Sequence, residues 1–259
     1  MISPFVLDVS LRQDQLAFQY GPAVIGPDTE FRRLDAIRPS LLDPQCSGPD
    51  PVYGIAMDVA RASDLADLKD RMLLFGIVAY AAGKLGDEPV RSQGHVHAIA
   101  PHSGWSPPEL FEILEGNAIV YAQRSTEDAP GECIAVTASE GDKVVVPPGW
   151  AHCVINADTA RRMVFGAWCD RQYGFVYEGV RRHGGLAWFP IVTATGAIEW
   201  LANPAYQASS LEVHAARVYP ELGLTSEGDI YLQFLLDPES VQWVSDPARK
   251  QSLWGAFRP

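Results

Sequence analysis

Three histidines and one glutamate have the residue types and spacing of a metal site. His95 and His97 are separated by one residue, so on a β-strand both side chains would project to the same face. Glu109 and His152 lie in other short β-rich segments and could reach the same interior from neighbouring strands. Imidazole and carboxylate ligands suit iron(II), manganese(II), nickel(II), zinc(II) or cobalt(II). The pattern therefore predicts one divalent ion bound by these four residues.

Other residues close to this pattern are predicted to stay out of the metal site. Strand alternation puts Glu112 on the face opposite Glu109, where we expect a solvated or edge position. The same alternation turns Cys153 away from the neighbouring His152. His102 lies in the loop between His97 and Glu109, and we expect it on the surface or at the mouth of the cavity. The cysteines form no C-x-x-C pair and are expected to be free thiols: Cys46, Cys133, Cys153 and Cys169.

The segments that carry these residues have the pattern of short β-strands. Strands are expected at 74–82, 110–122 with a turn at 115–117, 133–137, 142–146, 152–155, 162–168 and 184–192, with a hairpin partner at 198–200. A turn is expected at 83–86. Many short strands separated by glycine and proline turns favour an all-β sandwich or small barrel.

The flanking segments are predicted to extend one domain, residues 1–259. Residues 1–72 form an N-terminal arm with a helical pattern at 31–37 and a short helix over 64–72, for which Ser63 is the expected N-cap. Residues 73–200 form the β-barrel core. Residues 201–259 form a C-terminal extension with short helices, and its last part, 248–257, is helical or drapes over the barrel.

Composition excludes several classes of partner. The net charge of −12 over 259 residues disfavours nucleic acid and anionic membrane surfaces. No apolar run reaches the roughly 18 residues that a membrane-spanning helix requires. The first residues lack the basic and apolar regions of a signal peptide. We therefore expect a cytoplasmic protein that acts on a small molecule.

Two motifs resemble the signature of the cupin superfamily. The motif G-x5-P-x-G-x2-H-x3-N is matched by Gly141, Pro147, Gly149, His152 and Asn156. The motif H-x-H followed by E-x6-G is matched by His95, His97, Glu109 and Gly116. The spacer between His97 and Glu109 is longer than usual, and Gly86 lies too far ahead of His95 for the opening glycine. The resemblance implies a cupin fold, a jelly-roll β-barrel that binds a metal ion in its interior.

Further segments carry a second resemblance, over roughly residues 30 to 205. They are 33–39, 48–53, 83–86, 94–97, 108–116, 146–152, 177–178 and 183–188. On these residues the chain resembles the cupin-type glucose-6-phosphate isomerases of archaea and some bacteria. The resemblance implies interconversion of glucose 6-phosphate and fructose 6-phosphate in glycolysis and gluconeogenesis. It also implies a divalent metal, with iron(II) favoured and manganese(II), nickel(II) or zinc(II) as alternatives, and by analogy a homodimer.

The same resemblance assigns roles to individual residues. A proton-transfer route would use Glu109 as base with Tyr177 as a second catalytic residue, whereas a metal-assisted hydride shift would need no base. Ser92 and the Gly94 backbone N–H would bind the phosphate, and Lys84 and Tyr173 would contribute to substrate binding.

Three departures remove polar groups that the resemblance would place in the pocket. Val78 and Phe111 stand where the family has a threonine and a tyrosine, and the residues at 174–177 lack a histidine. The alternatives are therefore a cupin isomerase of another sugar, an iron-dependent dioxygenase, and a non-catalytic sugar-binding cupin.

Overall fold

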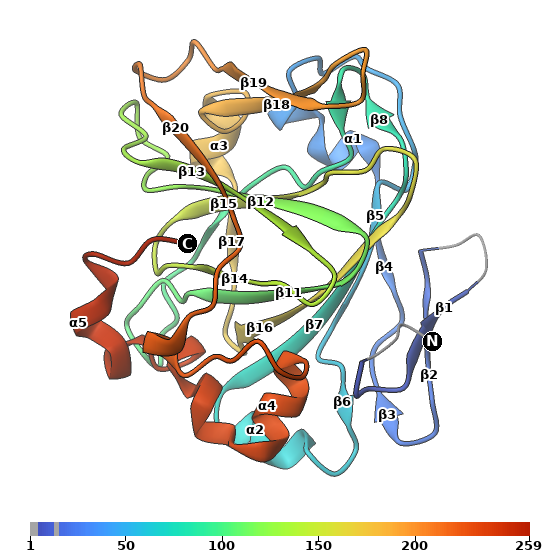
Figure 1. Ribbon diagram of the computed structural model, residues 1–259, viewed down its shortest axis with the longest axis vertical. Coiled ribbons are helices and arrows are strands. Elements are labelled where there is room, and N and C mark those ends of the chain that lie inside the picture. Colours follow the sequence, from blue (N-terminus) through green and yellow to red (C-terminus); the bar gives the residue numbers. More distant parts are fainter. Residues whose placement is uncertain (1–4, 13–15) are drawn as a thin grey trace.

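Two facing β-sheets form the body of the protein (Figure 1). The computed structural model describes residues 5–12 and 16–259. The six-stranded sheet has the order β14 (Lys143–Val146), β11 (Glu109–Glu115), β16 (Met163–Asp170), β7 (Leu73–Tyr80), β5 (Tyr53–Met57) and β4 (Glu30–Arg32). The four-stranded sheet has the order β15 (Ala151–Asn156), β12 (Asn117–Gln123), β13 (Cys133–Ser139) and β20 (Leu211–Ala215). The predicted all-β barrel of the jelly-roll type is confirmed.

Strand β7 shows why the six-stranded sheet is apolar on both faces. Its eight residues are all buried, and they alternate between two hydrophobic clusters. Leu73, Phe75 and Ile77 belong to the outer cluster, whereas Leu74 and Val78 belong to the barrel interior. Since successive side chains of a strand point to opposite faces, a continuous apolar run requires cover on both sides.

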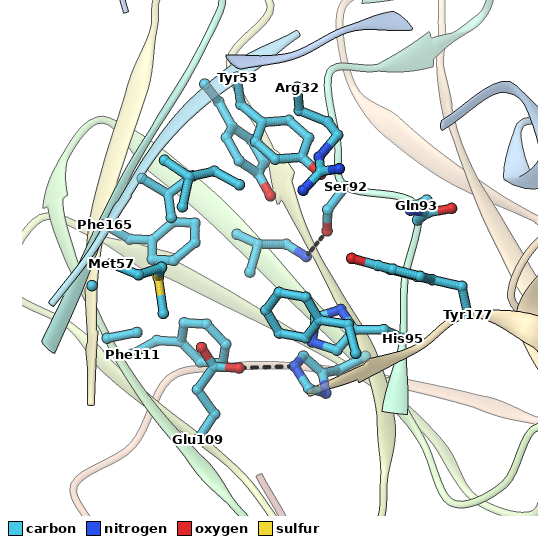
Figure 2. Close-up of a pocket in the computed structure, with 18 residues that line it drawn as sticks. Arg32, Tyr53, Met57, Ser92, Gln93, His95, Glu109, Phe111, Phe165 and Tyr177 are labelled. Atoms are coloured by element: carbon cyan, nitrogen blue, oxygen red, sulfur yellow. Dashed lines mark hydrogen bonds and ion pairs between the residues drawn. The ribbon is translucent and has the colours of Figure 1, made fainter. Parts of the chain in front are cut away.

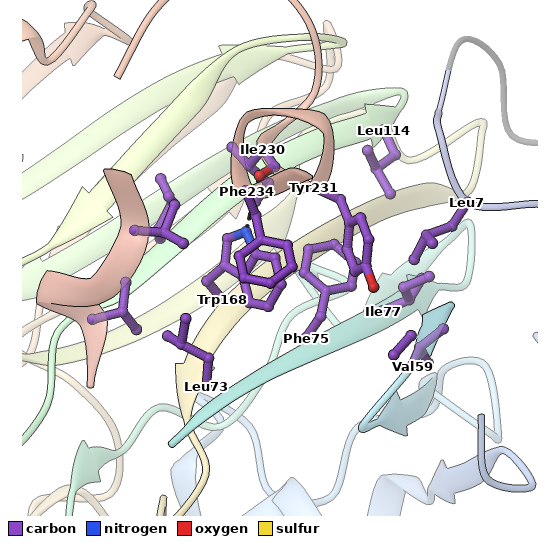
Figure 3. Packing of buried hydrophobic residues seen from close by; sticks show 14 of the residues in the cluster. Leu7, Val59, Leu73, Phe75, Ile77, Leu114, Trp168, Ile230, Tyr231 and Phe234 are labelled. Carbon is purple, nitrogen blue, oxygen red and sulfur yellow. Dashed lines mark hydrogen bonds between the residues drawn. The ribbon is translucent and has the colours of Figure 1, made fainter. Parts of the chain in front are cut away.

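The C-terminal extension supplies the cover on the outer face. It consists of η2 (Pro220–Leu222), α4 (Ile230–Leu236), η3 (Pro238–Val244), η4 (Pro247–Lys250) and α5 (Gln251–Trp254). Figure 3 shows Tyr231 and Phe234 of α4 packed on Phe75 and Trp168 of the sheet. The Trp168 Nε1–H donates to the Ile230 carbonyl at 3.1 Å. A helix near the end of the chain was predicted, but α4 and the strand β20 were not.

The N-terminal arm adds strands to the barrel edge. Its elements are β1 (Val9–Leu11), β2 (Phe18–Tyr20), β3 (Val24–Ile25), β4, α1 (Leu34–Ile37), η1 (Arg38–Ser40), β6 (Ala60–Arg61) and α2 (Leu65–Asp70). The helical pattern predicted at 31–37 is shortened because its first residues extend the six-stranded sheet. The predicted cap is wrong by one residue. Asp64 occupies the N-cap of α2, and the Ser63 hydroxyl donates to the Asp64 carboxylate instead.

The remaining elements are short. They are β8 (Lys84–Leu85), β9 (Glu88–Pro89), β10 (Val96–His97), β17 (Phe175–Val176), α3 (Glu178–Arg182), β18 (Trp188–Val192) and β19 (Ile198–Ala202). The predicted hairpin of the last two strands is confirmed. The turn expected at 83–86 is instead a short hairpin between β8 and β9. Within the described ranges, none of the helices is long and apolar enough to cross a membrane.

Glu112 corrects a prediction, because it faces away from Glu109 but is not solvated. Its carboxylate is buried under α4, where it accepts a hydrogen bond from the Ile230 backbone N–H at 2.7 Å. The Lys143 ammonium lies 4.0 Å away. Burial raises the pKa of Glu112 to about 7. The C-terminal extension, which lies far away in the sequence, creates this environment.

Glu112 should therefore make the protein less stable as the pH rises. Since its pKa is raised in the folded state, the folded chain binds more protons than the unfolded chain up to about pH 7. The free energy of unfolding should fall by roughly 2 to 3 kcal/mol between pH 5 and pH 8 through this group. Glu112→Gln keeps an acceptor for Ile230 and should remove that slope in urea titrations. Glu140→Gln, at an exposed position, is the matched control. Parallel pH slopes for wild type and Glu112→Gln would contradict this account.

Candidate active site

The two halves of the histidine pattern meet through a backbone pair. The His95 N–H donates to the His152 carbonyl at 3.0 Å, and the His152 N–H donates to the His95 carbonyl at 2.9 Å. Glu109 begins β11 in the facing sheet. One ligand atom from each of His95, His97, Glu109 and His152 lies within 4.8 Å of all the others. The fold therefore gathers all four residues that were predicted to bind the metal.

Backbone carbonyls orient two of the imidazoles. His97 Nδ1 lies 2.9 Å from the Pro107 carbonyl oxygen, and His152 Nδ1 lies 3.2 Å from that of Trp150. Because a carbonyl only accepts hydrogen bonds, each Nδ1 carries the proton in this arrangement. The Nε2 atoms are then left with free lone pairs directed toward Glu109, which is the tautomer that a metal-binding histidine requires.

Two inner nitrogen atoms of the site lack hydrogen-bond partners, and a bound cation could serve as the partner of both. Among the described residues, His95 Nε2 and His97 Nε2 are buried and make no hydrogen bond. Glu109 Oε2 lies 3.0 Å from His152 Nε2 and 3.2 Å from His97 Nε2. Unpaired buried nitrogen atoms cost about 1–3 kcal/mol each, and a bound metal ion would remove that cost. The residues fit a divalent metal.

The charge states of two side chains also suit metal binding. Burial, with the two neighbouring histidines, holds the pKa of His95 well below its usual value, so the ring is neutral. Burial alone would raise the pKa of Glu109, but the imidazoles of His152 and His97 beside its carboxylate hold that pKa well below its usual range. Neutral imidazole and ionised carboxylate are the forms that bind a metal ion.

Cys169 supports Glu109 from behind, which the sequence did not indicate. Its thiol lies 3.2 Å from Glu109 Oε1, so one carboxylate oxygen faces the thiol while Oε2 faces the histidines. Burial and the Glu109 charge raise the pKa of Cys169 well above its usual value, which keeps the thiol protonated as a donor. Cys153 lies in a different hydrophobic cluster, as strand alternation predicted.

Removing the Cys169 thiol should weaken metal binding. In Cys169→Ala the buried Glu109 Oε1 loses its donor, and affinity for manganese(II) should fall by roughly tenfold to a hundredfold, as for other groups that orient metal ligands. Cys169→Ser keeps a donor and should stay within a few-fold of wild type. Cys153→Ala removes a buried thiol elsewhere and serves as the control. Competition titration measures the affinity, and a wild-type value for Cys169→Ala would refute the role.

A cavity opens beside these ligands (Figure 2). Its inner end contains His95, Glu109 and His152. Apolar side chains form the walls: Ile55, Met57, Val78, Phe111, Val154, Phe165 and Phe175. Polar side chains gather at the other end: Arg32, Tyr53, Ser92, Gln93 and Tyr177. The cavity therefore joins a candidate metal site to a polar group of hydrogen-bond donors.

Comparison with protein families decides the classification. The profile of the family described as Glucose-6-phosphate isomerase (GPI) matches residues 41–207, more than half of the chain. The chain belongs to this family. The matched region contains the three histidines and Glu109.

Two curated relatives carry the family's name. A "Glucose-6-phosphate isomerase" of Thermococcus onnurineus (strain NA1) is 26% identical over 54% of this chain and 68% of its own length. A "Putative glucose-6-phosphate isomerase 1" of Rhizobium meliloti (strain 1021) is 23% identical over 56% of this chain. The alignment spans 63% of the Rhizobium protein, which is less than two thirds of its length.

Solved structures give partial matches. An oxalate oxidase in complex with glycolate superposes with a TM-score of 0.36 and 13% identity, covering 48% of this chain and 54% of that one. A Bacillus subtilis oxalate decarboxylase with Mn(II) centres gives a TM-score of 0.35 and 17% identity, covering 48% of this chain and 27% of that one.

Residues at the three places that the sequence analysis singled out as departures form part of the apolar wall. Val78, Phe111 and Phe175 line the cavity between the candidate ligands and the polar end. Phe111 packs edge-on against His152 at 5.9 Å between ring centroids.

The remaining predicted residues fall into two groups. Ser92 and Tyr177 line the cavity. Lys84 is a correction: its side chain is exposed in β8 and does not line the cavity, so a role in binding substrate there is not supported. Tyr173 is half-buried behind Phe175, with ring centroids 5.2 Å apart, and is not among the lining residues.

Gly94 adopts a backbone conformation that favours glycine. It has a φ of +87°, and a Cβ there would lie 2.7 Å from Leu186 Cδ1. The positive φ and the lack of space for a Cβ therefore explain why this residue is a glycine. His102 is tied to the buried Asp170 carboxylate, with 2.7 Å between Nε2 and Oδ2, and its side chain is 25% exposed.

Sequence reasoning missed Arg32, Tyr53 and Gln93 as cavity residues. Tyr53 fell within a segment that resembled the family but was given no role. Arg32 fell within a predicted helical pattern, whereas β4 pairs it with Tyr53 at the sheet edge. The Gln93 side-chain oxygen accepts from Arg181 Nε at 3.0 Å, and the Arg181 guanidinium lies 5.1 Å from the centre of the Tyr177 ring.

Proposed function

We propose that this protein is a metal-dependent aldose–ketose isomerase that interconverts glucose 6-phosphate and fructose 6-phosphate. The observation that carries the proposal is the convergence of His95, His97, Glu109 and His152 at the inner end of a cavity in a member of this family. The names of the two curated relatives support the same reaction.

The four convergent residues would hold the metal ion. When bound, a divalent ion would supply Lewis acidity to polarise the substrate carbonyl and a template for two neighbouring oxygens. The apolar walls exclude water from the reacting carbons. Burial raises the pKa of Tyr177, so its hydroxyl stays protonated and can donate to a substrate oxygen.

Glu109 and Tyr177 are the proposed catalytic residues. Glu109 has one oxygen beside the Cys169 thiol and the other beside two imidazoles, which weakens it as a base. This favours the route in which hydrogen passes between C2 and C1 of the sugar with its electron pair, while a proton moves between the two oxygens. Tyr177 would then serve the oxygen-to-oxygen proton transfer.

An isomerase assay tests the proposal. The protein is stripped of metal, reloaded with iron(II), manganese(II), nickel(II) or zinc(II), and supplied with fructose 6-phosphate. Glucose 6-phosphate should form with at least one metal, and product made in D₂O should carry little deuterium on carbon. Absence of turnover with every metal would sink the proposed reaction.

The apolar wall favours one second candidate, a cupin enzyme acting on a less polar or unphosphorylated sugar. Val78, Phe111 and Phe175 are the observation behind it. Turnover of a free ketose in place of fructose 6-phosphate would identify such an isomerase. Oxygen consumption with a bound sugar would indicate a dioxygenase, and binding without reaction would indicate a sugar-binding cupin.

We also propose iron(II) as the cellular metal, a homodimer as the assembly, and the cytoplasm as the location. The mixed imidazole and carboxylate ligands are compatible with iron(II), and the family resemblance favours it over the other divalent metals. A single domain is proposed because the arm and the C-terminal extension share one hydrophobic cluster with the barrel strands. Metal analysis of protein purified without added metal and light scattering would test the metal and the assembly.

A further inference from the structure

The Arg32 side chain lies at the polar end of the cavity, 23% exposed, without a full set of partners. Among the described residues, its Nε makes no hydrogen bond although water does not reach it. Its terminal nitrogen contacts the Glu30 carboxylate at 3.1 Å, but that glutamate side chain is 67% exposed. An unpaired buried donor of a charged group is costly, and an anionic ligand would satisfy it.

Strand alternation aims this side chain into the cavity. Arg32 lines the cavity, whereas its neighbours Phe31 and Arg33 project outward, with 39% of Phe31 and 60% of the Arg33 side chain exposed. The backbone register Arg32↔Tyr53 fixes the strand at the sheet edge. The N-terminal arm therefore contributes a cation to the cavity of the barrel.

Three hydroxyl groups face the same space. Figure 2 shows the Tyr53 hydroxyl near the Arg32 guanidinium, with Ser92 and Tyr177 at the same end of the cavity, away from Glu109. Burial raises the pKa of both tyrosines, which keeps their hydroxyls protonated as donors. Ser92 Oγ accepts from the Val154 N–H at 3.2 Å, so its own proton is available to a ligand.

The charge distribution favours an anion at this end. The chain carries a net charge of −12, yet among the described lining residues Glu109 is the one carboxylate, and it lies at the inner end. Arg181 adds a second cation beside Tyr177. Hydroxyls and a guanidinium around one space are the groups that bind a phosphate dianion.

We propose that Arg32 is the specificity-determining residue that selects phosphorylated over free sugars, its guanidinium binding the substrate phosphate together with the hydroxyls of Tyr53 and Ser92. The inference rests on the proposed isomerase function. Arg32 compensates for the hydroxyl groups that Val78 and Phe111 do not provide. It supplies charge from the arm where the family resemblance predicted neutral donors from the barrel.

Binding of an unreactive ligand tests this inference without turnover. Metal-loaded protein is titrated calorimetrically with D-glucitol 6-phosphate and with D-glucitol. Wild type should bind the phosphate ester and bind the free hexitol far more weakly. Arg32→Gln should weaken binding of the ester by roughly tenfold to a hundredfold, as expected for lost hydrogen bonds to a charged group. Arg33→Gln, which removes the neighbouring exposed guanidinium, should bind as wild type does.

The outcomes separate this inference from the function on which it rests. Wild-type affinity in folded Arg32→Gln, or equal affinity of wild type for the two ligands, overturns the role of Arg32. Should Arg32→Gln fail to fold, Arg32→Lys decides, because a point charge without the planar fork should lose about tenfold, and an unchanged affinity overturns the proposal. Binding through Arg32 without isomerisation supports this inference and rejects the isomerase. Isomerisation with an unchanged KM in Arg32→Gln keeps the isomerase and rejects this inference.

Discussion

His152→Ala is expected to abolish metal binding and to lower isomerase turnover by about a thousandfold or more, since a metal ion contributes several kcal/mol to such a reaction. His152 lies on β15, and its Nε2 is 3.0 Å from Glu109 Oε2. Its loss removes one of four converging ligand atoms and the shorter of the two imidazole contacts to Glu109 Oε2. The backbone pair between positions 95 and 152 does not involve the imidazole and can persist in the variant.

Two measurements check this prediction. Metal content per chain is determined by elemental analysis after reloading and gel filtration, and turnover of fructose 6-phosphate is measured on the same samples. His214→Ala is the control, since His214 is exposed on β20 outside the cavity. Both properties should be unchanged in the control. Full metal occupancy in folded His152→Ala would show that the ligand assignment is wrong.

The metal ligands could be predicted because their geometry is mostly local. The i, i+2 spacing of His95 and His97 fixes a shared face once the segment is extended, and the cupin motif supplies the pairing with His152. The strand patterns likewise depend on neighbouring residues, and β7, β11 and β16 lie within a few residues of their predicted limits.

The residues that sequence reasoning missed depend on contacts between distant segments. Cys169 meets Glu109 only because β16 pairs with β11 in a particular register. Glu112 is buried only because α4, more than a hundred residues later, covers its face of the sheet. Arg32 enters the cavity through an edge strand whose three residues carry no strong β pattern. None of these contacts is encoded in local periodicity.

Removing a buried aromatic side chain from the C-terminal extension is expected to lower the stability of the protein strongly. Phe234→Ala should lower the free energy of unfolding by about 3–5 kcal/mol, the usual range for a buried aromatic side chain. Phe234 is 2% exposed and packs on Trp168 and Tyr231, with ring centroids 5.1 and 5.8 Å away. The cavity left behind would lie against the outer face of β16, and the backbone of a central strand cannot collapse into it.

Leu236→Ala is the matched control, because Leu236 belongs to the same helix and is 79% exposed. Urea unfolding should separate the two variants by several kcal/mol while metal content at 25 °C stays equal, since the candidate ligands face the opposite side of the sheet. Equal stabilities would mean that α4 contributes little to the hydrophobic cluster. Loss of metal from folded Phe234→Ala would mean that the extension also shapes the site. The expected result assigns stability to the outer face of the six-stranded sheet and chemistry to its inner face.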